Sequence, residues 1–215
     1  MNKRNMLRAA TGAASLAGTA LFAYTAAIRP WHMRWGATDE EVRRAMPGDE
    51  IVPHPTYNAT RAITINARPK AIWPWLVQLG QGRGGMYSYE WIENRLMRLD
   101  MHNADRILPE FQHLHVGDVV PMSPAGIGPR VRALRPNQFL LLVFDDSAWT
   151  WSFGLYPAAH RQTRLVIRNR WDITGSLPML LMSVVLDPGD FMMERRMLLG
   201  IKQRAEGVRN HAVAI

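Results

Sequence analysis

One stretch of this chain alternates so regularly between aromatic and smaller side chains that it constrains the fold more than any other feature. Over residues 149–156, Trp149, Trp151 and Phe153 fall on one side of an extended backbone, and the residues between them fall on the other. Residues 163–171 repeat this period of two. Strands of this kind form antiparallel sheets with one apolar face. The aromatic face must therefore be covered by helices or enclose an apolar molecule.

The length, charge and cysteine content of the chain exclude several classes of protein. The 215 residues suffice for one sizeable domain, and the net charge of +8 comes from 26 basic against 18 acidic residues. The chain has no long run of like charges and no motif that reads nucleic acid, so we expect no nucleic-acid partner. The absence of cysteine excludes disulfides, thiol nucleophiles and cysteine-ligated zinc.

The N-terminal end carries an uncharged segment of membrane-spanning length. Residues 9–28 contain no charged side chain, and a helix of this length spans about 30 Å, the thickness of a bilayer core. We expect a basic tail and membrane anchor at 1–30, with the side of the membrane left open because basic residues flank both ends. The alternative is a signal peptide cleaved near 25–27, which predicts a secreted protein. A buried, alanine-rich soluble helix is a third interpretation.

Beyond this segment, the pattern predicts a linker arm at 31–58 and one domain at 59–215. Thr38 precedes three carboxylates, which predicts a capped short helix in the arm. Asp187 and Pro188 predict the start of a long amphipathic helix, because aspartate caps helices and proline suits their first position. The other expected helices are residues 69–79 and 88–99. The expected strands are residues 60–66, 118–122, 130–135, 138–144, 149–156 and 163–171.

This order of elements, together with several local stretches, resembles a known superfamily. The stretches are RWGATDEEV, AIWPWLVQLGQGRGGMYSYEWIEN, HNADRI and DPGDFMMERRMLLGIKQRAE. They are similar to the SRPBCC superfamily, also called START/Bet v 1-like and including polyketide cyclase/dehydrase-like proteins, and to a bacterial subgroup in which some members have an N-terminal hydrophobic segment. The resemblance implies an α+β helix-grip fold. In this fold a curved antiparallel β-sheet wraps around a long C-terminal helix and leaves an apolar cavity, here preceded by an N-terminal hydrophobic helix.

The resemblance also implies a function, because superfamily members bind lipids, sterols, polyketides or plant metabolites, and a minority are enzymes. We expect a membrane-tethered protein that binds a hydrophobic small molecule or lipid, without a cofactor. Trp149, Trp151 and Phe153 are expected to line the cavity from the sheet, and Met193 and Met197 from the helix. The alternative is a cyclase or dehydratase that acts on an apolar, polyketide-like substrate by general acid-base catalysis.

Polar candidates for the cavity gather in the middle of the chain. Arg83, Tyr87 and Tyr89 are expected at the cavity mouth, where an arginine can bind an anionic head group. Tyr87, Glu90 and His102 are the candidate catalytic groups. For His102, a turn whose side chains bind backbone groups is the competing interpretation.

Three further features favour structural roles. Gly80, Gly82 and Gly85 spell G-x-G-x-x-G, but no strand precedes them, so we expect a loop rather than a dinucleotide site. We expect no metal site from His102, His113 and His115, because no carboxylate accompanies them at a suitable spacing. Glu194 falls near the buried stripe of the last helix, where we expect it to pair with an arginine at the cavity rim.

Overall fold

The chain forms two compact units, one up to Met33 and one from Arg34 onward. The computed structural model describes residues 15, 18–19, 22–144, 149–172 and 177–212. In the first unit, a π-helical turn (Tyr24–Ile28) leads into the short helix α2 (Arg29–Met33). Half of the uncharged segment 9–28 lies outside the described residues. Within the part of the chain that the structure describes, no helix combines the length and apolar character that crossing a membrane requires. The anchor and the cleaved signal both stay predictions.

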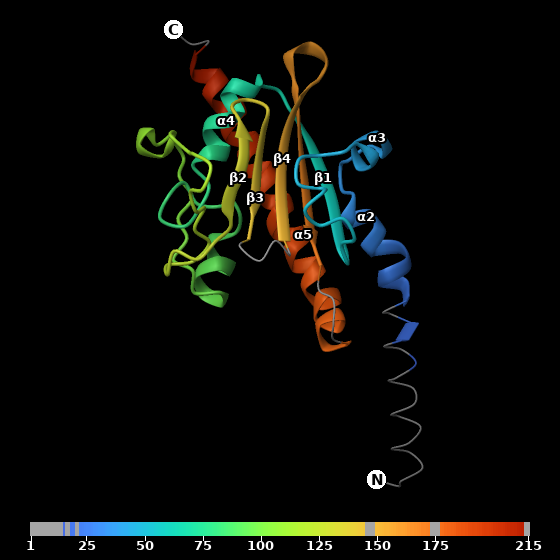
Figure 1. Cartoon of the computed structure of the whole chain (residues 1–215). Helices are drawn as coiled ribbons and strands as arrows, with labels where there is room; N and C mark the ends of the chain where they lie inside the picture. The colour runs from blue at the N-terminus through green and yellow to red at the C-terminus, as the bar shows by residue number, and fades with distance from the viewer. Residues whose placement is uncertain (1–14, 16–17, 20–21, 145–148, 173–176, 213–215) are drawn as a thin grey trace, which may run out of the picture. The chain divides into compact units, whose positions relative to one another are not determined.

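The second unit is built on a five-stranded antiparallel sheet with the order β1-β5-β4-β3-β2 (Figure 1). Strands β2 to β5 follow one another as a meander, and β1 pairs with β5. The first strand of the unit therefore lies beside the last one. The strands are β1 (Tyr57–Ile65), β2 (Arg130–Arg135), β3 (Phe139–Val143), β4 (Trp149–Pro157) and β5 (Thr163–Trp171).

All the predicted strands are found except residues 118–122. This stretch makes only an isolated bridge, between Val119 and Arg130. Its backbone still hydrogen-bonds to the chain ahead of β2, but Pro121 on one side and Pro129 on the other lack an N–H donor. A regular ladder needs those donors, so the pairing stops at a single bridge.

Helices cover one face of the sheet, called here the inner face. Figure 1 shows α5 (Leu177–Ala212) crossing this face, and α4 (Pro69–Val77) also packs against α5. A short 3-10 helix (Pro109–Phe111), a 3-10 turn (Ala159–Arg161) and a π-helix (Ile92–Leu96) complete the unit. The main core joins the sheet to both helices and includes Ile72, Trp75, Leu76, Leu140, Leu142, Phe153, Leu165, Ile167, Leu198 and Ile201.

Two predicted helix boundaries are wrong. The last helix begins at Leu177, ten residues before the predicted start at Asp187, and Pro188 lies inside it. Proline removes one backbone hydrogen bond, and a helix of 36 residues retains enough others to continue through it. The helix predicted from Ser88 is also shorter, because the Ser88 hydroxyl donates to the Glu93 carboxylate at 2.5 Å instead of capping the backbone.

The arm before β1 contains the helix α3 (Asp39–Arg43), and its predicted capping box is present. The Thr38 hydroxyl accepts from the Glu41 N–H at 3.2 Å, and the Glu41 carboxylate accepts from the Thr38 N–H at 2.8 Å. Both partners satisfy backbone donors that the start of a helix leaves without an intrahelical acceptor. The box therefore fixes where α3 begins.

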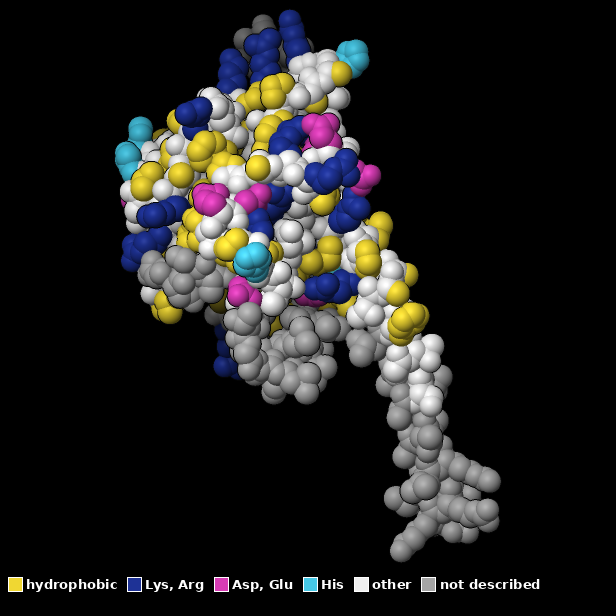
Figure 2. Space-filling view, turned by 45° about the vertical axis from the view of Figure 1, so that its right-hand side comes forward, with side chains coloured by type: hydrophobic (Ala, Val, Ile, Leu, Met, Phe, Trp, Pro, Cys, Tyr) yellow, Lys and Arg dark blue, Asp and Glu magenta, His cyan; other side chains and the backbone are white. Residues whose placement is uncertain are grey.

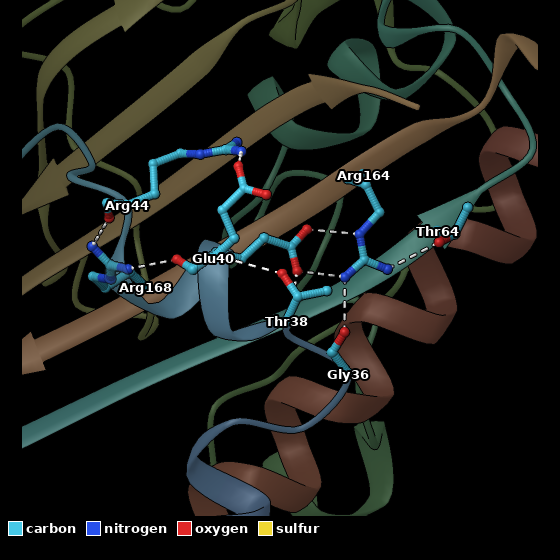
Figure 3. Close-up of polar contacts among 8 residues, drawn as sticks. Gly36, Thr38, Glu40, Arg44, Thr64, Arg164 and Arg168 are labelled. Carbon is cyan, nitrogen blue, oxygen red and sulfur yellow. Dashed lines mark hydrogen bonds and ion pairs between the residues drawn. The ribbon is translucent and has the colours of Figure 1, made fainter. Parts of the chain in front are cut away.

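The arm binds the outer face of the sheet through arginines of β5 (Figure 3). Arg164 donates to both Glu41 oxygens, at 2.7 and 2.8 Å, and to the Gly36 carbonyl at 2.8 Å. Arg168 donates to the Arg44 carbonyl at 2.8 Å. It also donates to Asp49 at 2.6 Å. On the α3 side of the molecule, basic and acidic side chains are intermingled (Figure 2). The outer face of β5 is thus occupied by the chain's own arm.

Candidate functional site

Four aromatic rings form a row along the inner face of the sheet. Alternate residues of β4 point to the same side, so Trp149, Trp151 and Phe153 all pack against the main core. The ring centroids are 4.3 Å apart for Phe144 and Trp149, 6.1 Å for Trp149 and Trp151, and 4.8 Å for Trp151 and Phe153. These separations are those of favourable aromatic pairs. We call the four residues the aromatic row.

The aromatic row is buried at one end and partly exposed at the other. Phe153 is 0% exposed and Trp151 is 6% exposed, whereas Trp149 and Phe144 are half-buried. The indole N–H of Trp149 donates to the side-chain oxygen of Asn169 on β5, which holds that ring in place. The row therefore connects the rim of the sheet to the core through a continuous apolar surface.

A buried arginine lies beside the aromatic row. Arg61 of β1 is 0% exposed, and its Nη1 lies 2.8 Å from Asp190 Oδ2 and 2.5 Å from Glu194 Oε2. The Tyr57 hydroxyl donates to Asp190 at 2.5 Å, and the Trp151 indole N–H donates to Glu194 at 2.9 Å. Tyr57, Arg61, Asp190 and Glu194 are called the charge cluster. Trp151 joins this cluster to the aromatic row, so the two form one site.

The backbone explains why these groups meet. On β1, Tyr57 and Arg61 are four residues apart, an even spacing that places both on the inner face. On α5, Asp190 and Glu194 are also four residues apart, which places them on one side of the helix. Strand β1 and helix α5 cross where these side chains lie, so the buried Arg61 guanidinium contacts both Asp190 and Glu194.

Burial governs the ionisation of the charge cluster. It raises the pKa of the Glu194 carboxyl, against the lowering effect of Arg61. Burial and the negative charge of Asp190 raise the pKa of Tyr57, so its hydroxyl stays protonated at neutral pH. Burial alone would lower the pKa of Arg61, but the two carboxylates outweigh it and raise that pKa. One guanidinium thus serves two carboxyl groups, and burial opposes the ionisation of Glu194 while Arg61 favours it.

The two methionines predicted on the helix side take different positions. Met197 is 2% exposed and belongs to the main core, together with Trp151 and Phe153. Met193 is half-buried. Contact of either side chain with a ligand stays a prediction.

The residues predicted at the cavity mouth have partners within the protein. The Arg83 guanidinium donates to the Val77 carbonyl at 2.8 Å and lies 4.6 Å from the centre of the Phe111 ring. It thereby satisfies a carbonyl that the end of α4 leaves without an intrahelical donor. Tyr89 is half-buried, with the Arg196 guanidinium 5.8 Å from its ring centre. An anionic head group would have to compete with these contacts of Arg83.

The predicted catalytic groups differ in exposure and in their partners. Tyr87 is 1% exposed and belongs to the main core. The Glu90 carboxylate accepts from the Asn103 N–H at 2.6 Å. The His102 side chain is 78% exposed and lies 3.3 Å from Asp100. One of the three groups therefore lies in the core and another faces solvent.

The histidine and glycine motifs have no ligand geometry in the described part of the chain. Among the residues described, no group of three or more His, Asp or Glu side chains is placed to hold a metal ion. The glycine motif follows α4 instead of a strand, and Gly80 and Gly85 exchange two backbone hydrogen bonds of 3.0 Å. Gly85 has a φ of 76°, and a Cβ there would lie 2.5 Å from the His102 carbonyl oxygen. Only glycine fits this close approach.

The sequence prediction omits Tyr57, Arg61 and Asp190. A signal for Arg61 is present, because it lies in phase with the buried residues of its strand, as Glu194 does with those of its helix. Charged residues in the buried phase of two separate elements indicate a buried ion pair. The predicted pairing of Glu194 with an arginine is confirmed, but it lies in the interior and not at a rim.

Comparisons with known proteins give similarity in structure only. No family model matches the chain, and no curated protein matches it. Among solved structures, the chain is similar to the KanY protein, with 14% identity, a TM-score of 0.45, and 69% of this chain and 97% of that chain covered. It is also similar to the Polyketide_cyc-like protein Cgl2372 from Corynebacterium glutamicum, with 14% identity, a TM-score of 0.43, and 72% and 94% covered.

A third solved structure is the self-sacrificing resistance protein CalC from Micromonospora echinospora. Its identity is 9% and its TM-score 0.38, with 70% of this chain and 94% of that chain covered. One of these structures, Cgl2372, is thus a polyketide cyclase-like protein. Similarity at this level does not indicate a function. The aromatic row and the charge cluster are the features of this chain that bear on its function.

Proposed function

We propose that the protein binds a hydrophobic small molecule or lipid in an apolar cavity between the sheet and α5. The observation that supports this proposal best is the aromatic row, which runs from half-buried Trp149 to fully buried Phe153. Apolar ligand surface that such rings remove from water contributes about 25 cal/mol per Å² to binding.

The charge cluster would orient the ligand. Apolar sites reach specificity through a small number of placed polar groups. Asp190 is the accessible member, with 25% of its side chain exposed, whereas Arg61 and Glu194 are buried behind it. A ligand with an apolar body and one hydrogen-bonding group therefore fits the site better than a pure hydrocarbon. The N-terminal segment would tether this binding unit to a membrane, as its length and composition indicate.

Binding of an uncharged fluorescent probe, N-phenyl-1-naphthylamine, tests the proposal on the purified full chain. We expect probe fluorescence to rise with the wild type and to fall severalfold with Trp149→Ala, which shortens the row at its accessible end. Trp91→Ala is the matched control, because Trp91 is 64% exposed and lies outside the row. Native mass spectrometry of the same preparation should detect a co-purified apolar compound.

Two results would count against the proposal. One is that neither a co-purified compound nor probe binding is detected. The other is that the probe signal survives Trp149→Ala and disappears in Trp91→Ala, which would place binding on the surface. Catalysis by Tyr87, Glu90 and His102 as one set is not proposed, because Tyr87 is buried in the core and the His102 side chain faces solvent.

A further inference from the structure

We propose that residues 90–98 form a second functional surface, which docks on membranes that contain anionic lipid. This surface surrounds the π-helix Ile92–Leu96 and is separate from the aromatic row. The inference does not depend on the cavity or on the N-terminal segment. We call these residues the docking turn.

Large apolar side chains of the docking turn point into solvent. Leu96 is 77% exposed, Trp91 is 64% exposed and Met97 is 54% exposed. Ile92 and Glu93, by contrast, are 8% and 3% exposed and form its inward side. Single exposed apolar residues are ordinary, but three large ones within seven positions mark an interaction surface.

Basic side chains accompany these apolar groups. Arg95 and Arg98 are exposed, and none of the ion pairs among the described residues includes them. The acidic residues of the turn are engaged elsewhere, since Glu93 accepts from Ser88 and Glu90 accepts from the Asn103 backbone. The exposed charged side chains of the docking turn, Arg95 and Arg98, are therefore both basic, whereas Glu93 is buried and Glu90 is half-buried.

The docking turn is held in shape by its own side chains. The Asn94 side chain donates to the Met101 carbonyl at 2.8 Å and accepts from the Met101 N–H at 2.5 Å. The Ser88 hydroxyl binds Glu93 from beneath. These bonds fix the backbone of the turn to the chain on both sides, so binding has to order only the exposed side chains and not the loop itself.

Charge and composition favour a lipid surface over a protein partner or a second copy. Tryptophan prefers the interface between lipid head groups and tails, and arginine places its stem in the apolar layer while its guanidinium binds phosphate. A second copy is disfavoured, because each chain carries a charge of +8 and two docking turns in contact would oppose their arginines. An anionic membrane satisfies both the apolar and the basic side chains.

A single fluorescent label tests the docking turn directly, because the chain contains no cysteine. Full-length Leu96→Cys carries an environment-sensitive nitrobenzoxadiazole label and is mixed with vesicles of phosphatidylcholine, with or without phosphatidylglycerol. The matched control is Gln203→Cys, an exposed position on α5. The C-terminal part of α5 lies at the opposite end of the second unit from the π-helix Ile92–Leu96, which is drawn in green (Figure 1).

We expect a blue shift and quenching by lipid-attached nitroxides for the label at position 96 with anionic vesicles only. The control label should not change. When Arg95→Gln or Arg98→Gln is added to the protein labelled at position 96, the affinity for anionic vesicles should fall about fivefold. This is the effect of one basic residue near an anionic surface. High salt should weaken it as well.

Three outcomes would overturn the inference. The first is no change at position 96 although the chain is bound to vesicles, which would assign binding to the N-terminal segment alone. The second is an equal response with neutral vesicles and in the arginine variants. The third is a blue shift without vesicles that grows with protein concentration, which would identify a second copy as the occupant.

Discussion

Arg61 is the residue on which the interior of this protein depends most. It is fully buried, and it contacts both acidic groups of the charge cluster. Removing one partner of a buried ion pair leaves an uncompensated charge, which costs more than losing both partners together. The stability of the interior therefore depends on this guanidinium more than on either carboxylate alone.

We predict that Arg61→Met lowers the free energy of unfolding by about 3–5 kcal/mol at neutral pH. Glu194→Gln should cost less, because an amide oxygen still accepts from Trp151 and Arg61 keeps its pair with Asp190. Urea unfolding followed by circular dichroism measures both values. The control is Arg132→Met on β2, where the arginine is exposed. Equal stability of Arg61→Met and Arg132→Met would show that the cluster contributes nothing.

At the scale of elements, α3 couples the arm to the sheet through Glu41. Burial alone would raise the pKa of the Glu41 carboxyl, but hydrogen bonds from Arg164 and Thr38 outweigh burial and hold it below the usual value of 4.5. A carboxyl with a lowered pKa in the folded state stabilises the fold above its unfolded pKa and loses that effect as pH falls through its folded pKa. The arm is thus held more firmly at neutral than at acidic pH.

We predict that Glu41→Gln is less stable than the wild type above pH 4.5 and that the difference shrinks as pH falls below this value. Glu194 has the opposite dependence, because its pKa is raised, but it is present in both proteins and cancels in the comparison. Urea midpoints of both proteins across the acidic to neutral range provide the measurement. A difference that is constant with pH would contradict the ion-pair explanation and leave only the helix cap.

The sequence predicts the bounds of a strand or helix correctly where the local residue pattern and the packing in the folded chain favour the same structure. The period of two placed β5 at its observed bounds, and the capping box at Thr38 marked the start of α3. It did not locate the start of α5, because Asp187 followed by Pro188 has the same local signature at a helix start and inside a long helix. The charge cluster was missed because a contact between β1 and α5 joins residues 129 and 133 positions apart.

At the scale of the molecule, the sheet is covered on both faces by different parts of the chain. Helices α4 and α5 cover the inner face, where the aromatic row lies, and the arm covers the outer face of β5. Arg168 is only 4% exposed at its side chain and donates to three backbone carbonyls of the arm, those of Glu41, Val42 and Arg44. The arm therefore acts as a layer of the fold and not merely as a connection to the N-terminal unit.

Two truncated chains test whether the arm stabilises the fold as a layer or serves only as a connection to the N-terminal unit. A chain that begins at Arg34 keeps the contacts that Gly36, Glu41 and Asp49 make with β5 and should unfold in one cooperative transition. A chain that begins at Ile51 loses Glu41, Asp49 and Met46, so the outer face of β5 is exposed to water and the hydrogen bonds of Arg164 and Arg168 to the arm are lost. We expect this second chain to be destabilised by about 3 kcal/mol or more, the order of two hydrogen bonds to charged groups. Differential scanning calorimetry of the two chains and their rates of cleavage by trypsin would measure the difference. Equal melting temperatures and equal cleavage rates would show that the outer layer contributes nothing to stability.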